Sequence, residues 1–185
     1  MSTHHVNDVG PRVQCIPEGD DRHRLTCPDC GYIAYENPKI VIGAVCRWDA
    51  RILLCRRAIE PRRGYWTLPA GYLELNESVE DGARREAWEE ARAELALGPL
   101  LAVYSITRIN LVQIIFRARL LRANVSPGPE SSEVHLFRWD EIPFAELAFP
   151  SVQWALEHDR RAEEGVTPVA ASNPEPEVPL KSPPL

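Results

Sequence analysis

Apolar residues in the middle of the chain fall into short runs bounded by turn-forming residues, a pattern that predicts β-strands. The runs are rich in Val, Ile and Leu and occur at residues 40–47, 51–57, 101–108, 111–120 and 134–139. Only Trp48-Asp49-Ala50 separates the first run from the second, which is typical of a hairpin. The third and fourth runs turn at Ile109-Asn110.

Two other segments show the spacing of amphipathic helices. In the first, Ser78 is a candidate N-cap, and Val79, Ala83 and Ala87 form a stripe of small apolar residues. The second follows a proline and covers residues 151–164. A mixed sheet with helices on both faces satisfies all of these elements, which places the chain in the α/β class.

The pattern divides the chain into an N-terminal segment at residues 1–38, a main domain at 39–164 and a tail at 165–185. The tail is rich in Pro, Ser and acidic residues and almost lacks large apolar side chains. Such a segment cannot bury enough surface to order itself, so we predict a disordered tail. A polyproline II docking motif is the alternative use of this segment.

Composition narrows the classes of partner. The 185 residues carry a formal net charge of -6, which argues against nucleic acid because backbone recognition needs a basic face. No apolar run approaches membrane-spanning length, and the polar start MSTHHVND has no signal-peptide core. Five cysteines without a disulfide-rich composition suit a reducing compartment. We therefore expect a soluble, cytoplasmic protein with no membrane partner.

Residues 71–92, GYLELNESVEDGARREAWEEAR, carry the clearest chemistry. Glu86, Glu89 and Glu90 stand at i, i+3 and i+4, so a helix places all three carboxylates on one face. Like charges at this spacing destabilise an isolated helix by roughly 0.2–0.5 kcal/mol per pair, so a neutralising cation is expected. Hard oxygen ligands indicate Mg²⁺ or Mn²⁺.

A run of Glu and Arg on a helix is usually a solvated face, but this segment has a more specific joint spacing. Six specified positions recur by chance on the order of once per hundred thousand chains of this size. They are Gly71, Glu77, Arg85, Glu86, Glu89 and Glu90. At these positions the chain resembles the Nudix hydrolases, whose signature has the same residues at the same spacing. The resemblance covers residues 39–158 and implies the α/β/α sandwich of that family.

One departure from the signature affects the predicted helix. Arg92 occupies the final glycine position, where glycine normally supplies a left-handed C-cap. Without that glycine we expect the helix to continue through Glu94 and Leu95, with Gly98-Pro99 as the alternative stop. Arg92 at this position therefore affects the expected end of the helix. It does not affect the expected metal ligands, since none of them lies at this position.

The resemblance implies a hydrolase that cleaves a nucleoside diphosphate linked to another moiety. A trio of carboxylates holding divalent cations suits water attack on a phosphorus of a diphosphate. We expect Glu86 and Glu90 to be the principal metal ligands, with Glu89 either a further ligand or the base that takes the proton of the water. The segment YWTLPAG, which ends at Gly71, resembles the approach to the family's signature, and the carbonyl of Ala70 is there a further ligand.

Supporting residues follow from the same family pattern. Arg85 and Glu77 orient the ligand carboxylates, where the alternative is a surface ion pair worth ~0–1 kcal/mol. Related enzymes often carry another catalytic or metal-binding glutamate in the segment that here reads PGPESSEVHLF. For that role we favour Glu133 over Glu130, with neither residue being involved as the alternative.

Substrate contacts are sought in the loop before Tyr65-Trp66. Arg56, Arg57, Arg62 and Arg63 bracket this loop. Arg57 is a candidate phosphate ligand, against the alternative that loop arginines are merely solvated. Trp66 or Tyr65 is a candidate for stacking on a base of the substrate. The alternative is that the aromatic ring belongs to the hydrophobic core.

The substrate class rests on the branch of the family that the chain resembles. The segments LLCRRAIEPRRGYWTLPAGYLE, PGPES and DEIPFAELAFPS resemble the branch associated with FAD and ADP-ribose hydrolysis, whereas the SQPWPFPxS array of NADH pyrophosphatases is absent. The resemblance also implies a homodimer.

The N-terminal segment resembles the zinc ribbon of one branch of the family, with one half eroded. CPDCG supplies Cys27 and Cys30, but Val6 and Val9 stand where the other cysteine pair belongs. A tetrahedral site needs four ligands, so a structural zinc is not expected. Rescue of the site would have to come from His4, His5 or Cys15.

Two other classes compete with the enzyme. A catalytically silent Nudix-like regulator that binds nucleotides is the first, but it has no reason to keep an unneutralised carboxylate cluster. The second, a zinc-ribbon nucleic-acid binder, is disfavoured by the missing ligands and the acidic balance.

Overall fold

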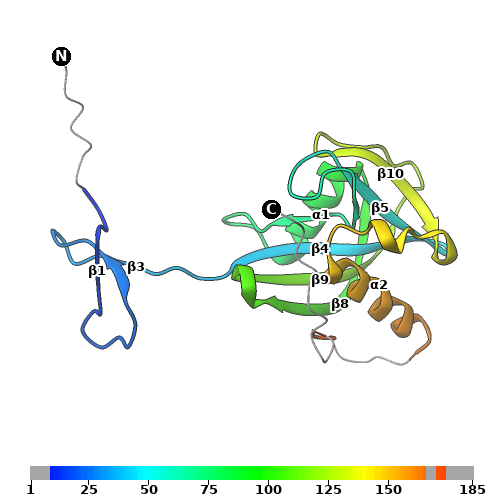
Figure 1. Ribbon diagram of the computed structural model, residues 1–185. Helices are drawn as coiled ribbons and strands as arrows, with labels where there is room; N and C mark the ends of the chain where they lie inside the picture. Colours follow the sequence, from blue (N-terminus) through cyan, green and yellow to red (C-terminus); the bar gives the residue numbers. More distant parts are fainter. Residues whose placement is uncertain (1–8, 166–169, 174–185) are drawn as a thin grey trace, which may run out of the picture. The chain divides into compact units, whose positions relative to one another are not determined.

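The computed structural model describes residues 9–165 and 170–173 (Figure 1). Contacts between Cα atoms divide the chain into two compact units, Met1–Pro38 and Lys39–Leu185. In the first unit, three short antiparallel strands pair in the order β1 (Val13–Cys15), β2 (Arg24–Thr26) and β3 (Ile33–Ala34). The predictions for His4, His5 and Val6 concern residues outside the described ones.

The second unit is built on a seven-stranded sheet with the order β10-β5-β4-β9-β8, from which β6 branches off β5 and β7 off β4. The strands are β4 (Lys39–Trp48), β5 (Arg51–Arg57), β6 (Trp66–Thr67), β7 (Ala70–Tyr72), β8 (Leu95–Ile106), β9 (Leu111–Leu120) and β10 (Ser131–Arg138). β4 and β9 pair in parallel while the other named pairs are antiparallel. The predicted mixed sheet is confirmed.

The sheet opens beside the predicted hairpin. β4 and β5 pair only next to their turn, at Arg47–Trp48 against Arg51–Ile52. Further along, β4 pairs with β7 and β5 pairs with β6, so the two strands diverge. This divergence places β7 within the sheet, next to the helix that follows it.

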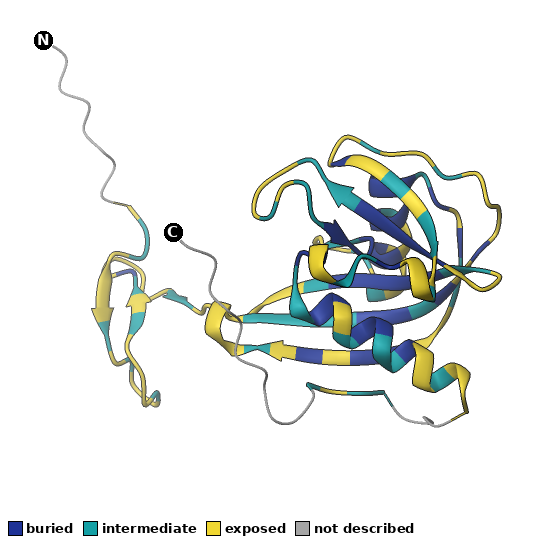
Figure 2. Cartoon of the chain, turned by 45° about the vertical axis from the view of Figure 1, so that its right-hand side comes forward, coloured by how far each residue is buried: buried dark blue, intermediate teal, exposed yellow. Residues whose placement is uncertain are grey.

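Two helices cover the sheet, α1 (Val79–Ala91) and α2 (Pro150–Glu163). Alternate residues of β4 face opposite sides: Val45 belongs to the core under α2, and Cys46 belongs to the core under α1. Figure 2 shows the buried positions in the strands and along both helices. The α/β/α sandwich is confirmed, with three short 3₁₀ helices at Thr107–Ile109, Trp139–Glu141 and Phe144–Glu146.

The predicted continuation of the first helix is wrong. α1 ends at Ala91, and Arg92 itself adopts the left-handed conformation with φ 52° and ψ 30°. The Arg92 N–H donates to the Trp88 carbonyl (2.9 Å) and the Ala93 N–H to the Ala87 carbonyl (3.1 Å), the bonding that a glycine cap usually supports. Tertiary pairing explains the stop, because Leu95 already pairs with Leu120 and starts β8 six residues earlier than the apolar run predicts.

Part of the predicted tail lies along the edge of the sheet. The Ala171 N–H donates to the Leu101 carbonyl (2.8 Å), and the Ala171 carbonyl accepts from Val103 (3.0 Å). The Asn173 side chain makes two hydrogen bonds of 2.9 Å with the Ser105 backbone. The rest of the tail after Gly165 falls outside the described residues, as does any docking motif there. Within the described chain, no helix is long and apolar enough to cross a membrane.

Candidate active site

The carboxylate-bearing helix starts where the sequence predicts. Ser78 is the N-cap of α1, and its hydroxyl accepts from the Asp81 N–H (3.1 Å). The side chain of Glu89 is about half exposed, whereas Glu86 and Glu90 are 9% and 5% exposed. Of the three clustered glutamates, two are therefore buried against the sheet.

Arg85 gathers five acceptor atoms from four residues around its guanidinium. Its Nε and Nη2 donate to the two Glu77 carboxylate oxygens (3.0 and 2.7 Å), and Nη2 also donates to the Tyr72 carbonyl (3.0 Å). Its Nη1 donates to both Glu86 and Glu89 (2.8 Å each). These hydrogen bonds lower the pKa of Glu77 to about 2 and raise the pKa of Arg85. The structure thus brings together all four predicted residues of this group.

Glu90, one turn after Glu86, contacts β7. Its Oε2 accepts from the Ala70 N–H (3.1 Å), so the helix and the strand before it are joined at this carboxylate. Gly71 leaves room for the Glu86 carboxylate, because a Cβ at position 71 would overlap it. Because Gly71 has no side chain, the Glu86 carboxylate can pack against the backbone of β7.

Burial changes the acidity of both inner carboxylates. Desolvation raises the pKa of Glu90 to about 8, with the nearby Glu86 charge adding to the effect. Burial likewise raises the pKa of Glu86, against the opposing effect of Arg85. Two carboxylates held this way in low dielectric are poorly compensated as anions. A bound cation would reverse this balance.

The donor set fits a divalent cation that is completed by other oxygens. Glu86, Glu90 and the backbone of Ala70 are neighbours, and all offer the hard oxygens that Mg²⁺ and Mn²⁺ prefer. As they stand, no three Asp, Glu, His or Cys side chains among the described residues could hold a metal ion. Glu89 instead pairs with Arg85. Phosphate oxygens of a substrate are the natural additional ligands.

The loop after β9 lies against the end of α1. The Gly128 N–H donates to the Glu90 carbonyl (2.9 Å) and the Ser126 N–H to the Ala91 carbonyl (3.0 Å), which satisfies carbonyls that a helix end leaves free. A Cβ at Gly128 would overlap the Glu89 backbone. Sequence reasoning missed this docking, and the glycine in PGPES is its only local signal.

The two glutamates of this segment are placed differently. The charge of Glu130 acts on both Glu86 and Glu90, and its carbonyl accepts from the Ala58 N–H (2.8 Å). Glu133 instead pairs with Arg56 at 3.5 Å and is about half exposed. Glu130 is therefore the glutamate of this segment that the structure brings near the carboxylate pair.

The two predicted substrate contacts, Arg57 and Trp66, lie in different surroundings. The positive charge of Arg57 acts on Glu90, and its Nε donates to the Pro61 carbonyl (2.7 Å). Trp66 is only 5% exposed and packs edge-on against Phe137 with ring centroids 5.0 Å apart, so it belongs to the core. Tyr65 is the more accessible aromatic, with Arg62 stacked over its ring at 4.6 Å.

Comparison with known proteins assigns the class of this fold and site. The family model described as the NUDIX domain matches residues 37–157, and the model described as Nudix N-terminal matches residues 10–36. The chain therefore belongs to the Nudix hydrolase family.

Individual relatives agree with this assignment. A crystal structure of a Nudix hydrolase from Nitrosomonas europaea matches with a TM-score of 0.82 and 43% identity, covering 86% of this chain and 91% of that one. An ADP-ribose pyrophosphatase from Methanocaldococcus jannaschii is 30% identical over 64% of this chain and 71% of its own. A MutT-like protein from Streptomyces ambofaciens is 37% identical over 55% of this chain, and the match spans 64% of that relative.

Proposed function

We propose that this chain is a metal-dependent pyrophosphatase that hydrolyses a nucleoside diphosphate linked to another moiety, with ADP-ribose and FAD as first candidates. The observation that carries the proposal is the pair of buried carboxylates, Glu86 and Glu90, on one turn of α1 beside Ala70. An uncompensated buried pair destabilises the fold, so its retention is explained by a cation and an anionic substrate. The relative named as an ADP-ribose pyrophosphatase supports this choice of substrate.

In this proposal Glu86, Glu90 and the Ala70 carbonyl hold Mg²⁺ or Mn²⁺. When bound, such an ion neutralises charge on the diphosphate and lowers the pKa of a coordinated water. Arg85 donates a hydrogen bond to the Glu86 carboxylate and fixes its position. The same guanidinium also binds Glu77, which in turn holds Arg85. Both are positioning residues, because they act through the ligands and not on the substrate.

The proton of the attacking water goes to a glutamate. We assign this role to Glu130, whose charge acts on Glu86 and Glu90, and keep Glu89 as the second candidate and as a further metal ligand. The water oxygen forms a bond to one phosphorus, and the bond from that phosphorus to the bridging oxygen breaks. The second phosphate leaves with the bridging oxygen, which gives two phosphorylated products.

Arg57 is the proposed contact for the substrate phosphates. Its positive charge interacts with the Glu90 carboxylate, so it lies close enough to the proposed metal site to bind a phosphate held there. Tyr65 replaces Trp66 as the candidate for stacking on a base, since the indole is buried. The homodimer expected from the family resemblance is part of this proposal, and light scattering of the purified protein tests it.

A substrate panel tests the proposal. The purified chain is incubated with FAD, ADP-ribose, NADH, diadenosine polyphosphates and nucleoside triphosphates, with Mg²⁺, with Mn²⁺ and with chelator. We expect metal-dependent release of two phosphorylated products from a dinucleotide or nucleotide sugar. Nucleotide binding without turnover on any substrate, with Glu90→Gln equal to the wild type in metal binding, would instead establish a silent regulator.

A further inference from the structure

The N-terminal unit matches a family of zinc ribbons, but its residues do not fit zinc. Cys27 and Cys30 provide two thiols, whereas a structural zinc site takes four ligands. The described part of this unit contains no group of three or more Cys, His, Asp or Glu side chains able to hold a metal ion. Cys15 is engaged elsewhere, with its sulfur 3.2 Å from the Thr26 hydroxyl.

The turn that carries the two cysteines is nevertheless well formed. The Gly31 N–H donates to the Cys27 carbonyl (2.9 Å), and the Cys27 N–H donates to the Tyr32 carbonyl (2.8 Å). Gly31 has φ 73°, a conformation that glycine adopts at no steric cost. Cys27 is only 4% exposed. Backbone hydrogen bonds thus hold this turn closed without a metal ion.

Arg12 connects the first strand of the unit to this turn. Its Nη1 and Nη2 donate to the two carboxylate oxygens of Asp29 (2.6 and 3.0 Å), the fork geometry that makes such pairs strong. Asp29 lies between the two cysteines in the sequence, and its Oδ2 is 3.8 Å from the Cys27 sulfur. The Arg12 guanidinium also interacts electrostatically with Cys27. Arg12 therefore places a fixed positive charge against the surviving half of the ribbon.

We propose that the Arg12 guanidinium takes the structural place of zinc in this unit, so that the ribbon is a metal-free fold. The backbone of Arg12 supports this role, because its N–H donates to the Thr26 carbonyl (2.9 Å) directly before Cys27. One residue thus links the first strand of the unit to the cysteine turn through its backbone and its side chain. An ion pair needs no metal supply, and the unit keeps its fold in the presence of a chelator.

Metal content is the first test. The untagged full chain is incubated with excess Zn²⁺, freed of unbound metal by gel filtration, and measured by mass spectrometry for zinc and by Co²⁺ absorption for thiolate ligation. We expect no thiolate-to-cobalt band, the same zinc content in the wild type and in Cys27→Ser/Cys30→Ser, and unchanged amide exchange at Cys27 and Gly31 on adding chelator. One equivalent of zinc that is lost in the double serine variant, or loss of amide protection with chelator, overturns the proposal.

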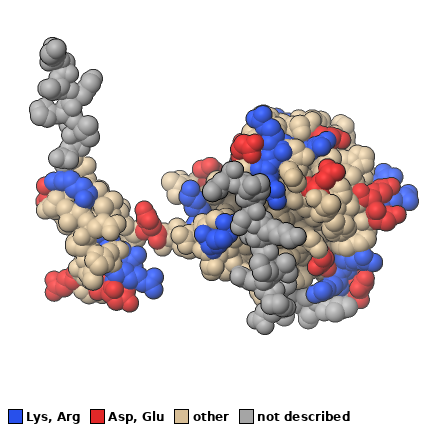
Figure 3. Space-filling model, viewed as in Figure 1, with Lys and Arg blue, Asp and Glu red and all other residues tan. Residues whose placement is uncertain are grey.

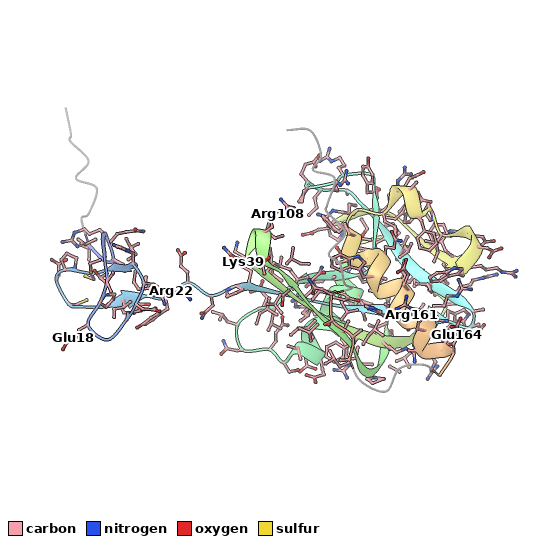
Figure 4. All side chains as sticks on the ribbon, turned by 60° about the horizontal axis from the view of Figure 1, so that its bottom comes forward. Glu18, Arg22, Lys39, Arg108, Arg161 and Glu164 are labelled. Carbon is pink, nitrogen blue, oxygen red and sulfur yellow. The ribbon has the colours of Figure 1, made fainter. Side chains whose placement is uncertain are left out.

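Substitution of the arginine is the second test. In Arg12→Ala we expect amide exchange at Cys27 and Gly31 to accelerate by about two- to fivefold, a modest effect since the pair is partly exposed, while amides of the Nudix domain are unchanged. The matched control is Arg22→Ala, since Arg22 lies in the same unit (Figure 4) and its 3.6 Å pair with Asp21 is largely exposed. Equal exchange in the two variants contradicts the proposal.

A conservative variant covers the case in which Arg12→Ala unfolds the unit, and a double-mutant cycle tests the pairing where the unit stays folded. Arg12→Lys keeps the charge but loses the fork, so we expect protection between that of the wild type and that of Arg12→Ala. Asp29→Ala and the double variant Arg12→Ala/Asp29→Ala complete the cycle. The proposal predicts that the double variant is no more labile than the worse single variant, and fully additive effects overturn it.

Discussion

At the scale of single residues, Glu90 combines near-complete burial with a negative charge that its surroundings do not favour. Desolvation raises its pKa to about 8, although it also accepts the Ala70 N–H. The folded protein therefore holds this proton more tightly than the unfolded chain does. The stability that this contributes is present below pH about 4.5 and is lost as the pH rises through about 8.

This sign gives a prediction for the metal-free protein. Between pH about 4.5 and about 8 the free energy of unfolding should fall in the wild type relative to Glu90→Gln, by up to about 5 kcal/mol, because one pKa unit is about 1.36 kcal/mol. Urea unfolding at a series of pH values with chelator measures it. Adding Mg²⁺ at pH 8 should restore stability to the wild type but not to Glu90→Gln. Superposable pH curves of the two proteins would contradict this account.

The base assignment is a second prediction at this scale. Glu130→Gln should lower kcat by about 10²–10⁴-fold, as expected for loss of a general base. Glu133→Gln is the matched control on the same segment and should change kcat by less than about threefold, because Glu133 pairs with Arg56 near the surface. Steady-state kinetics with saturating Mg²⁺ measure both. The reverse order of effects would return the role to Glu133.

At the scale of elements, α1 ends in a strained backbone conformation that the chain tolerates. Arg92 is left-handed, a conformation that costs a non-glycine residue roughly 1–2 kcal/mol. Its guanidinium offsets part of this, since it donates to the Trp88 carbonyl (3.3 Å) and lies 5.6 Å from the Trp88 ring centroid. Next to it, the loop at Ser126 and Gly128 bonds the last helical carbonyls.

We therefore predict that Arg92→Gly is more stable than the wild type by up to about 1 kcal/mol, because relief of the strain exceeds the added freedom of the unfolded chain. Arg92→Ala is the control, since it keeps the strain and loses the side-chain contacts, and should be less stable than the wild type. Chemical denaturation gives both values. The prediction fails if the glycine variant is no more stable than the alanine variant.

The second helix is fixed to the sheet by a buried ion cluster. Asp159 of α2 is fully buried and accepts from Arg47 on β4 (2.5 Å) and Arg117 on β9 (2.7 Å). Glu163 contacts both arginines one turn later. This cluster joins α2 to the central parallel pair of strands.

Removing the buried acid should be costly. Asp159→Ala leaves two arginines without their main partner, so we expect a loss of about 3–5 kcal/mol in unfolding free energy. Glu164→Ala is the control at the C-cap of the same helix, because its 3.6 Å pair with Arg160 is exposed, and should cost less than about 1 kcal/mol. Thermal and urea unfolding compare them. Similar losses in the two variants would show that the cluster does not anchor α2.

Sequence periodicity predicts the long strands and both helices because their apolar residues face a core with a regular period. β6 and β7, at two and three residues, are too short to show a period and exist through their pairing with β5 and β4. Spacing within one helix likewise predicts the carboxylate cluster. Which of Glu130 and Glu133 lies near that cluster could not be predicted from the sequence, since it depends on how a distant loop docks on the end of α1.

At the scale of the whole molecule, the excess of acidic side chains is not gathered in one patch of the surface that Figure 3 shows. On the face seen in Figure 3, acidic and basic side chains are interspersed, without one continuous basic stripe. The net charge of -6 and this distribution favour a small anionic substrate drawn by a bound cation over a nucleic acid held by its backbone. The carboxylate cluster of the Nudix domain is thus the feature on which the proposed function depends.

Hydrolysis of ADP-ribose in ¹⁸O-labelled water, with Mg²⁺, tests this central claim most directly. We predict AMP and ribose 5-phosphate as products, with label in the phosphate of one of them. With chelator the rate should fall to background, and Glu90→Gln should lose at least about 10²-fold in rate with Mg²⁺ present. Turnover that is equal in Glu90→Gln and the wild type, or that persists undiminished with chelator, would contradict a reaction carried by the Glu86 and Glu90 pair.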